Sequence, residues 1–158
     1  MCGRRIVSAS LDGTIKTWTE SDPVIPNLTP WAPAVSDGVC TSTLHGPVPN
    51  NPIFCAQWLK HSHGMLTGSS NASTYIWDLH KQAVTGELKG HSGSVYSLYK
   101  AEEGTINSTI LTGASDHTIK IWDEKTNHCE TTLTGHSGSV MTVKSDGAYQ
   151  VSSSQALI

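Results

Sequence analysis

Histidine and cysteine are the side chains of this sequence best suited to bind a metal ion or to act in catalysis. Their densest group is His61 and His63, which flank one serine and follow Cys55 along the chain. Zinc sites usually pair their ligands as C-x₂₋₄-C and H-x₃₋₅-H, and this group contains neither pair. The P-loop, G-x-S-x-G and H-E-x-x-H patterns do not occur in the sequence. We therefore expect no metal site, no cofactor and no catalytic centre.

The composition is that of a globular domain with few charges. The chain has 158 residues, of which 37% are apolar and only 15% are charged, and its net charge is −3. Direct nucleic-acid binding needs clustered lysine and arginine, so we do not expect it here. No segment approaches the ~20 apolar residues that cross a bilayer, so we expect no membrane association.

The four cysteines are far apart, and none belongs to a C-x-x-C pair: Cys2, Cys40, Cys55 and Cys129. The first residues also lack the apolar stretch of a signal peptide. We therefore expect free thiols and an intracellular protein, in the cytoplasm or the nucleus.

Internal repetition is the strongest pattern in the sequence. Gly90–Val95 recurs unchanged as Gly135–Val140, 45 residues later, and Ile-Trp-Asp triplets place Trp77 and Trp122 at the same spacing. The segment ending at Trp18 parallels the one ending at Trp122. A period of this length indicates stacked structural units.

Each repeat contains short runs of residues that favour strands, separated by turn-forming clusters. The clearest runs are Ser94–Tyr99, Thr109–Thr112, Thr118–Trp122 and Cys129–Leu133. No stretch has the periodicity of a substantial helix. Four short strands cannot bury their apolar faces alone, so we expect an all-β fold in which neighbouring units stack.

The Gly-His start and the Trp-Asp end of each unit resemble the WD-repeat family, whose units are blades of a β-propeller. The resemblance implies four-stranded antiparallel sheets in an incomplete propeller. It divides the chain into an incomplete first blade at 1–46, a second at 47–89, a third at 90–134 and a truncated fourth at 135–158. Propellers close with four to eight blades. We expect missing segments of a longer protein, a second copy or a different chain to complete the ring.

In this family a buried hydrogen-bond chain often ties a blade together, and the resemblance implies one complete set of its residues. The set joins the Gly-His histidine, a strand hydroxyl, a turn aspartate and a tryptophan: His91, Thr112, Asp116 and Trp122. We interpret it as structural, because its positions repeat with the blades, whereas a hydrolase triad occupies one cleft.

The other blades carry partial sets. These are Ser8, Asp12 and Trp18 in the first, Thr67, Asn71 and Trp77 in the second, and His136 and Ser152 in the last. Pro47 stands at the histidine position of the second blade, which predicts a weaker network there.

Two connections are longer than the repeat requires, and we expect them to contact partner proteins. The first is a proline-rich insertion near 20–37 that carries Pro30, Trp31 and Pro33, and the second contains Glu102 and Glu103. The Gly-His and aspartate turns on the opposite face are small and polar, and they indicate no specific ligand.

These features predict a non-catalytic scaffold that presents rigid loops to partner proteins. The resemblance leaves alternatives open. The chain could be the propeller portion of a larger multidomain protein, as a substrate-recognition subunit of a ubiquitin ligase or a module attached to a catalytic domain. It could also be a subunit of an RNA-processing or chromatin complex.

Overall fold

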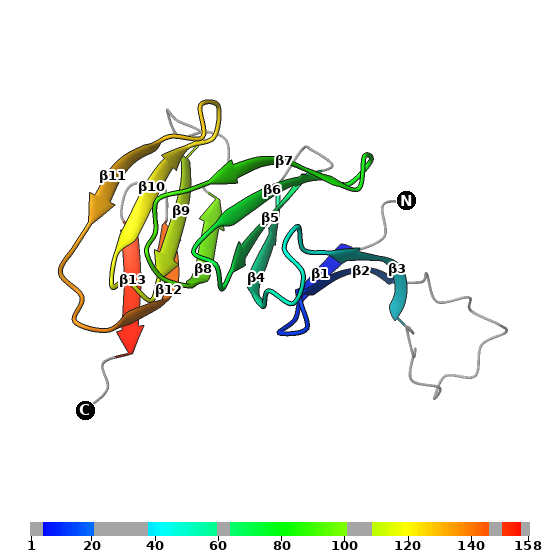
Figure 1. Ribbon diagram of the computed structural model, residues 1–158, viewed down its shortest axis with the longest axis horizontal. Coiled ribbons are helices and arrows are strands. Elements are labelled where there is room, and N and C mark those ends of the chain that lie inside the picture. The colour runs from blue at the N-terminus through cyan, green and yellow to red at the C-terminus, as the bar shows by residue number, and fades with distance from the viewer. Residues whose placement is uncertain (1–4, 21–37, 60–63, 101–108, 146–149, 156–158) are drawn as a thin grey trace, which may run out of the picture.

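The structure is a computed structural model that describes residues 5–20, 38–59, 64–100, 109–145 and 150–155 (Figure 1). Within these ranges the chain forms thirteen strands and no helix, which confirms the predicted all-β fold. The strands form four antiparallel sheets in which neighbours in sequence are neighbours in space.

The first sheet consists of β1 (Arg5–Ala9), β2 (Thr14–Glu20) and β3 (Gly38–His45). The second consists of β4 (Ile53–Trp58), β5 (Gly64–Ser69), β6 (Thr74–Asp78) and β7 (Ala83–Leu88). The third consists of β8 (Val95–Lys100), β9 (Thr109–Ala114), β10 (Ile119–Asp123) and β11 (Cys129–Leu133). The fourth consists of β12 (Ser139–Ser145) and β13 (Gln150–Gln155).

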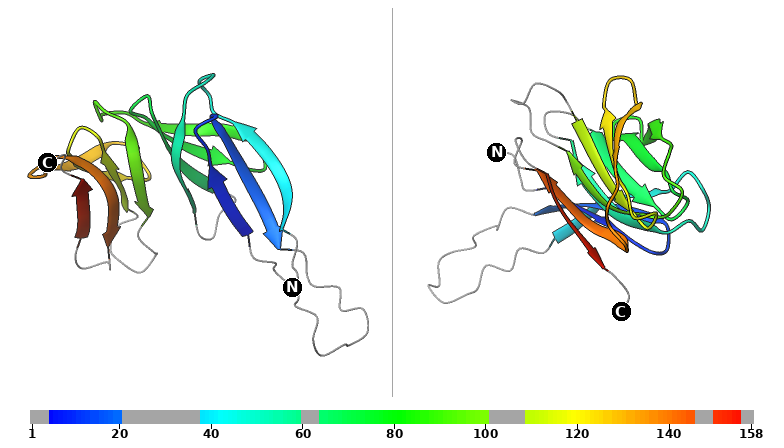
Figure 2. Two further views of the ribbon diagram at one scale, coloured as in Figure 1. Left: turned by 90° about the horizontal axis from the view of Figure 1, so that it is seen from below. Right: turned by 90° about the vertical axis from the view of Figure 1, so that its left-hand side faces the viewer.

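The sheets stand next to one another in chain order, like the blades of a fan (Figures 1 and 2). Neighbouring sheets contact each other mainly through the first strand of each sheet: β4 packs on β8, and β8 packs on β12. We call β4, β8 and β12 the inner strands. The outer strands β7 and β11 lie farther from this line of contact (Figure 1). This arrangement leaves β4, β8 and β12 side by side.

Apolar side chains fill the space between neighbouring sheets. Leu66 and Leu88 of the second sheet pack against Val95, Ile110 and Trp122 of the third, and all five side chains are buried. Similar clusters join the first sheet to the second and the third to the fourth. Burial of this apolar surface holds the sheets together, since no single sheet can cover its own faces.

Two strand glycines let neighbouring sheets approach closely. A Cβ atom on Gly68 would lie 2.8 Å from the Val95 Cγ1 of the next sheet, and one on Gly113 would lie 2.7 Å from the Val140 Cγ1. Any larger residue would push the sheets apart. Glycine is therefore required here by close packing between sheets.

Candidate functional site

His91 and Asp116 lie at the centre of a buried network in the third sheet. The His91 Nδ1 lies 2.8 Å from the Asp116 Oδ2, and its Nε2 lies 2.7 Å from the Thr112 Oγ1. The Trp122 Nε1 donates to the same Thr112 oxygen at 2.8 Å. The four side chains that the sequence singled out thus form one continuous chain of hydrogen bonds.

A neutral His91 imidazole satisfies all the hydrogen bonds of this network. Burial lowers the pKa of His91 below its ordinary value, against the opposing effect of the Asp116 carboxylate. The proton on Nδ1 then donates to Asp116, while Nε2 accepts from the Thr112 hydroxyl. The Thr112 oxygen in turn accepts from Trp122, so every polar side-chain group of this four-residue network has a partner.

Asp116 also fixes the backbone around it. Its carboxylate accepts from the Ser92 amide at 3.0 Å and from the Thr118 amide and hydroxyl at 3.0 and 2.7 Å. Burial raises the pKa of Asp116, but the hydrogen bonds from Thr118, Ser92 and His91 outweigh it and bring the pKa to about 2. One carboxylate therefore ties the connection entering β8 to the β9–β10 turn.

Acidification is expected to destabilise the fold in two stages. The folded-state pKa of His91 is lowered, so the unfolded chain takes up its proton first and stability falls once the pH drops below 6.5. Asp116 has a folded-state pKa of about 2 and an ordinary value of 3.8, so its contribution is lost between those two pH values. Urea unfolding across this range measures both stages. The variant Asp116→Asn should not show the second loss of stability, between pH 3.8 and about 2. If its stability falls there as much as that of the wild type, Asp116 is not the group responsible.

The second sheet keeps only part of the network. The Trp77 Nε1 donates to the Thr67 Oγ1 at 2.9 Å, as Trp122 does to Thr112 in the third sheet. Asn71 instead bonds to the two strands beside its turn: its Oδ1 accepts from the Ser69 hydroxyl of β5 at 2.5 Å, and its Nδ2 donates to the Tyr75 hydroxyl of β6 at 2.6 Å. No histidine among the described residues takes part, and Pro47 stands at the position where His91 stands in the third sheet.

The first sheet keeps one bond, from the Trp18 Nε1 to the Ser8 Oγ at 2.9 Å, and Ser8 is exposed. Asp12 bonds to the amide and hydroxyl of Thr14 at 2.8 and 2.7 Å, and these contacts lie within its own turn. The aspartates at the same motif position therefore have different roles. Of Asp12 and Asp116, only Asp116 bonds to a histidine.

Several residues that the sequence analysis considered, as predicted contacts or as a rejected metal site, lie outside what the structure describes. These are the insertion residues Pro30, Trp31, Pro33, Glu102 and Glu103, the histidines His61 and His63, and the side chain of Ser152. His136 precedes β12 and is partly buried. The Cys55 thiol is in contact with the Val95 carbonyl, and burial raises its pKa to about 12, so it is an inert thiol.

The turns of neighbouring sheets are tied together on one side of the molecule. The Ser94 hydroxyl donates to the Ser70 carbonyl of the second sheet at 3.2 Å, while within the third sheet the Ser94 carbonyl accepts from the Ser115 amide at 2.9 Å. The Ile53 amide donates in the same way to the Ser10 carbonyl. We call this side, with the β1–β2, β5–β6 and β9–β10 turns and the connections entering β4, β8 and β12, the turn face.

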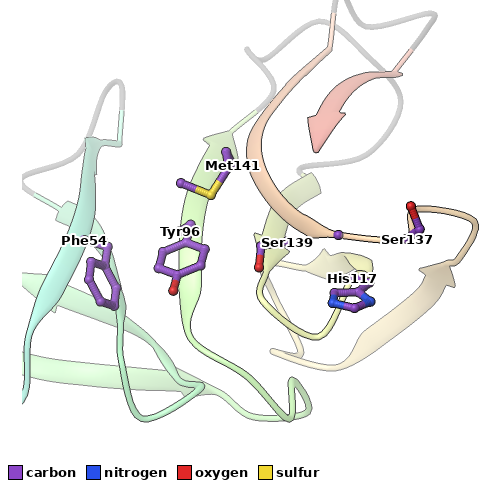
Figure 3. Close-up of a pocket in the computed structure, with 7 residues that line it drawn as sticks. Phe54, Tyr96, His117, Ser137, Ser139 and Met141 are labelled. Atoms are coloured by element: carbon purple, nitrogen blue, oxygen red, sulfur yellow. The ribbon is translucent and has the colours of Figure 1, made fainter. Parts of the chain in front are cut away.

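A cavity of about 640 Å³ opens where the turn face meets the inner strands (Figure 3). Its lining comes from three sheets: Phe54, Tyr96, His117, Ser137, Gly138, Ser139 and Met141. The Phe54 and Tyr96 rings pack edge to face, with centroids 4.8 Å apart. The volume lies in the ~300–1,000 Å³ range of ligand sites.

The three large apolar residues of the cavity occupy equivalent β-bulges. In β4 the pairing shifts between Ile53 and Cys55, so Phe54 is the extra residue of that strand. Tyr96 and Met141 occupy the same place in β8 and β12. A bulge turns the side chain of its extra residue away from the regular alternation. The repeat thereby displays one large apolar side chain from each inner strand.

Sequence reasoning missed these residues, because the polar turns indicated no aromatic group on this face. Each aromatic lies one position inside the strand that follows its connection, and not in the turn itself. The sequence did contain a signal for them. Phe54, Tyr96 and Met141 each directly follow the isoleucine or valine near the start of β4, β8 or β12.

His117 occupies a strained backbone position beside this cavity. Its φ is 66°, as is that of Ala72 in the β5–β6 turn, and the equivalent residue of the β1–β2 turn is Gly13, with a φ of 78°. Glycine adopts this left-handed conformation freely, whereas other residues incur a cost of about 1 kcal/mol or more. A left-handed residue thus recurs at this place in all three turns, and in two of them it is not glycine.

Comparison with known proteins agrees with this architecture. Residues 38–78 and 82–123 match the family model of the WD domain, G-beta repeat. The matches span more than half of the chain, and the protein belongs to the WD-repeat family, as the sequence predicted. Each matched unit begins at the outer strand of one sheet and ends at the third strand of the next.

A similar fold is found in the crystal structure of the WD40 β-propeller domain of Doa1, with a TM-score of 0.74 and 18% sequence identity. The similarity covers 95% of this chain and 43% of that chain, so this chain spans less than half of the structure it matches. No curated protein matches the sequence.

Propellers of this family generally bind other proteins and are generally non-catalytic. Across the described ranges, the chain forms no helix that could span a lipid bilayer.

Proposed function

We propose that this chain is a non-catalytic interaction module that binds other proteins through its turn face. The observation that carries the proposal is the network of His91 and Asp116, which locks the β9–β10 turn to the connection entering β8. A turn held in place before binding loses little conformational entropy when a partner docks. The cavity beside that turn offers the partner a concave, partly apolar contact surface.

Capture of binding proteins from a cell lysate, with matched surface variants, tests this proposal. Met141→Glu places a charge in the cavity at a residue that is 43% exposed. Thr131→Glu places the same charge on the exposed outer strand β11. We expect proteins that bind the wild type and Thr131→Glu to be lost with Met141→Glu. Recovery of one unchanged set by all three proteins would contradict the proposal.

We propose further that another blade packs against the outer face of the first sheet. Ile6 is 58% exposed there, whereas the equivalent residues of the next two sheets, Met65 and Ile110, are fully buried by a neighbouring sheet. A segment of a longer protein, a second copy or a different chain would cover Ile6 equally well. Light scattering on residues 1–158 distinguishes the second copy, which doubles the mass, from the other two.

A further inference from the structure

A second pocket lies between the first two sheets, at the end away from the turn face. Its volume is about 140 Å³, and residues of both sheets line it. Thr17, Thr41 and Ser42 belong to β2 and β3, whereas Trp58 ends β4 and Leu79 follows β6. About five water molecules occupy this volume in the liquid, so the pocket fits one small ring or one side chain.

Three hydroxyl groups of this pocket have no proton left to donate. The Thr41 hydroxyl donates to the Thr17 carbonyl at 3.1 Å, so the Thr41 oxygen accepts from the Thr17 hydroxyl at 2.9 Å. The Thr17 Oγ1 in turn accepts from the Ser42 hydroxyl at 2.8 Å. A hydroxyl has one proton and two lone pairs, so all three protons are used while lone pairs remain. The trio therefore offers acceptors, and no donor, to a ligand.

An ion pair occupies the equivalent place between the second and third sheets. Lys100 ends β8 as Trp58 ends β4, and Glu124 follows β10 as Leu79 follows β6. The Lys100 ammonium group bonds to the Glu124 carboxylate at 2.6 Å, and the lysine side chain is only 11% exposed. One junction between sheets thus holds a donor and a carboxylate, and the other has an indole, an isobutyl group and a pocket.

The lining favours an uncharged group that carries an N–H donor. Acceptor oxygens attract a group that donates and disfavour a carboxylate or a phosphate. Among the described residues the lining includes no charged side chain, so an ammonium or amidinium group would lose hydration without gaining a counter-charge. Trp58 and Leu79 offer apolar surface to the rest of the ligand.

We propose that this pocket binds a carboxamide group on an apolar body. The amide nitrogen carries two donor protons and no charge, and it donates to the Thr41 and Ser42 oxygens. The apolar body lies against Trp58 and Leu79. The pocket is open on one side, where the amide carbonyl keeps its water. Free aromatic amides and the side chains of glutamine and asparagine share this chemistry. The site lies apart from the turn face, so the inference goes beyond the proposed interaction function.

Fluorine NMR of protein labelled with 5-fluorotryptophan tests the ligand class. The Trp58 signal reports on the pocket, and that of Trp122, buried in the third sheet, is the internal control. Each signal is assigned by its loss in the phenylalanine variant. We expect benzamide to shift the Trp58 signal and to leave that of Trp122 unmoved. N,N-dimethylbenzamide lacks the donor, benzamidinium adds a positive charge and benzoate adds a negative one, so all three should bind at least about tenfold more weakly.

A blocked tripeptide distinguishes the two sources of the carboxamide. Gly-Gln-Gly with an acetyl and a methylamide cap carries the group on a peptide. Tighter binding of this probe than of benzamide would assign the site to a partner's side chain, and weaker binding would assign it to a free amide. No shift of Trp58 with either probe, or equal binding of benzamidinium and benzamide, would overturn the proposal.

The chain offers a matched pair of variants that separates binding from folding. Thr41 and Thr85 are the extra residues of the bulges in β3 and β7. Their hydroxyls donate in the same way, to the carbonyls of Thr17 at 3.1 Å and of Ile76 at 3.3 Å. Thr41→Val should weaken benzamide binding about fivefold, whereas Thr85→Val should leave it unchanged, with similar melting temperatures for both. If Thr41→Val melts earlier and still binds benzamide as the wild type does, its hydroxyl serves the fold and the proposal is refuted.

The variant Leu79→Glu tests the selection against charge. It supplies a carboxylate at the place that Glu124 occupies at the next junction. Benzamidinium should then bind more tightly than benzamide, because the carboxylate balances its charge and accepts its N–H groups. An unchanged order of the two probes would place them outside this pocket and would overturn the assignment.

Discussion

Replacing Thr112 with valine is expected to lower the free energy of unfolding by about 3 kcal/mol. The Thr112 hydroxyl bonds to both the His91 Nε2 and the Trp122 Nε1, and all three residues are buried. Valine keeps the shape of the side chain but removes the hydroxyl. Two buried nitrogen atoms then lose their partner at once, and water cannot reach them to replace it.

The chain offers two matched controls at equivalent positions. The Thr67 hydroxyl is buried but serves only Trp77, so Thr67→Val should cost about 1.5 kcal/mol. Ser8 serves Trp18 at an exposed site, so Ser8→Ala should cost less than about 0.5 kcal/mol. Urea unfolding at neutral pH measures all three variants. If the three variants lose equal amounts of unfolding free energy, the bond from Thr112 to His91 does not stabilise the third sheet.

Replacing Gly113 with alanine is expected to cost about 3 kcal/mol through overpacking. The new Cβ would lie 2.6 Å from the Ser97 Oγ, 2.7 Å from the Val140 Cγ1 and 2.8 Å from the Val143 Cγ2. Both valines belong to the fourth sheet and are buried, so they cannot move aside freely. The methyl group should therefore force the third and fourth sheets apart.

Gly46→Ala provides the control for this effect. Its nearest neighbour would be the Ile53 Cδ1 at 3.3 Å, the mobile end of a side chain, so the cost should be below about 1 kcal/mol. Val143→Ala combined with Gly113→Ala should recover part of the lost stability, because the removed methyl groups make room for the added one. Thermal unfolding of Gly113→Ala at the wild-type temperature would mean that the sheets do not pack this closely.

The strands and the buried network were accessible from the sequence because both repeat. Strand-forming runs between turn clusters placed β9 and β11 close to their observed bounds. The four members of the network stand at fixed distances from the Gly-His and Trp-Asp signatures, and the resemblance of these signatures to WD repeats is what pointed to His91 and Asp116. Their contacts depend on local pairing, which the period of the repeat already defines.

The cavity was not accessible in this way, because it depends on packing between sheets. Phe54, Tyr96 and Met141 lie far apart in the sequence and meet only after three sheets have stacked. The bulges that display them shift the strand pairing by one residue, and simple alternation does not predict such shifts. Motif matching also did not predict the contacts of Asp12. Its motif matches that of Asp116, but Asp12 bonds within its own turn and not to a histidine.

Nitrogen NMR of the His91 imidazole ring tests the central claim most directly, with the signal assigned by its loss in His91→Gln. The account predicts a neutral ring with its proton on Nδ1, which donates to Asp116, and with Nε2 accepting from Thr112. Because burial lowers the pKa of His91, this ring should still be neutral in the folded chain when the pH first falls below 6.5. A ring that takes up a proton near pH 6.5 while the strands remain intact would contradict the buried network and the locked turn that it supports.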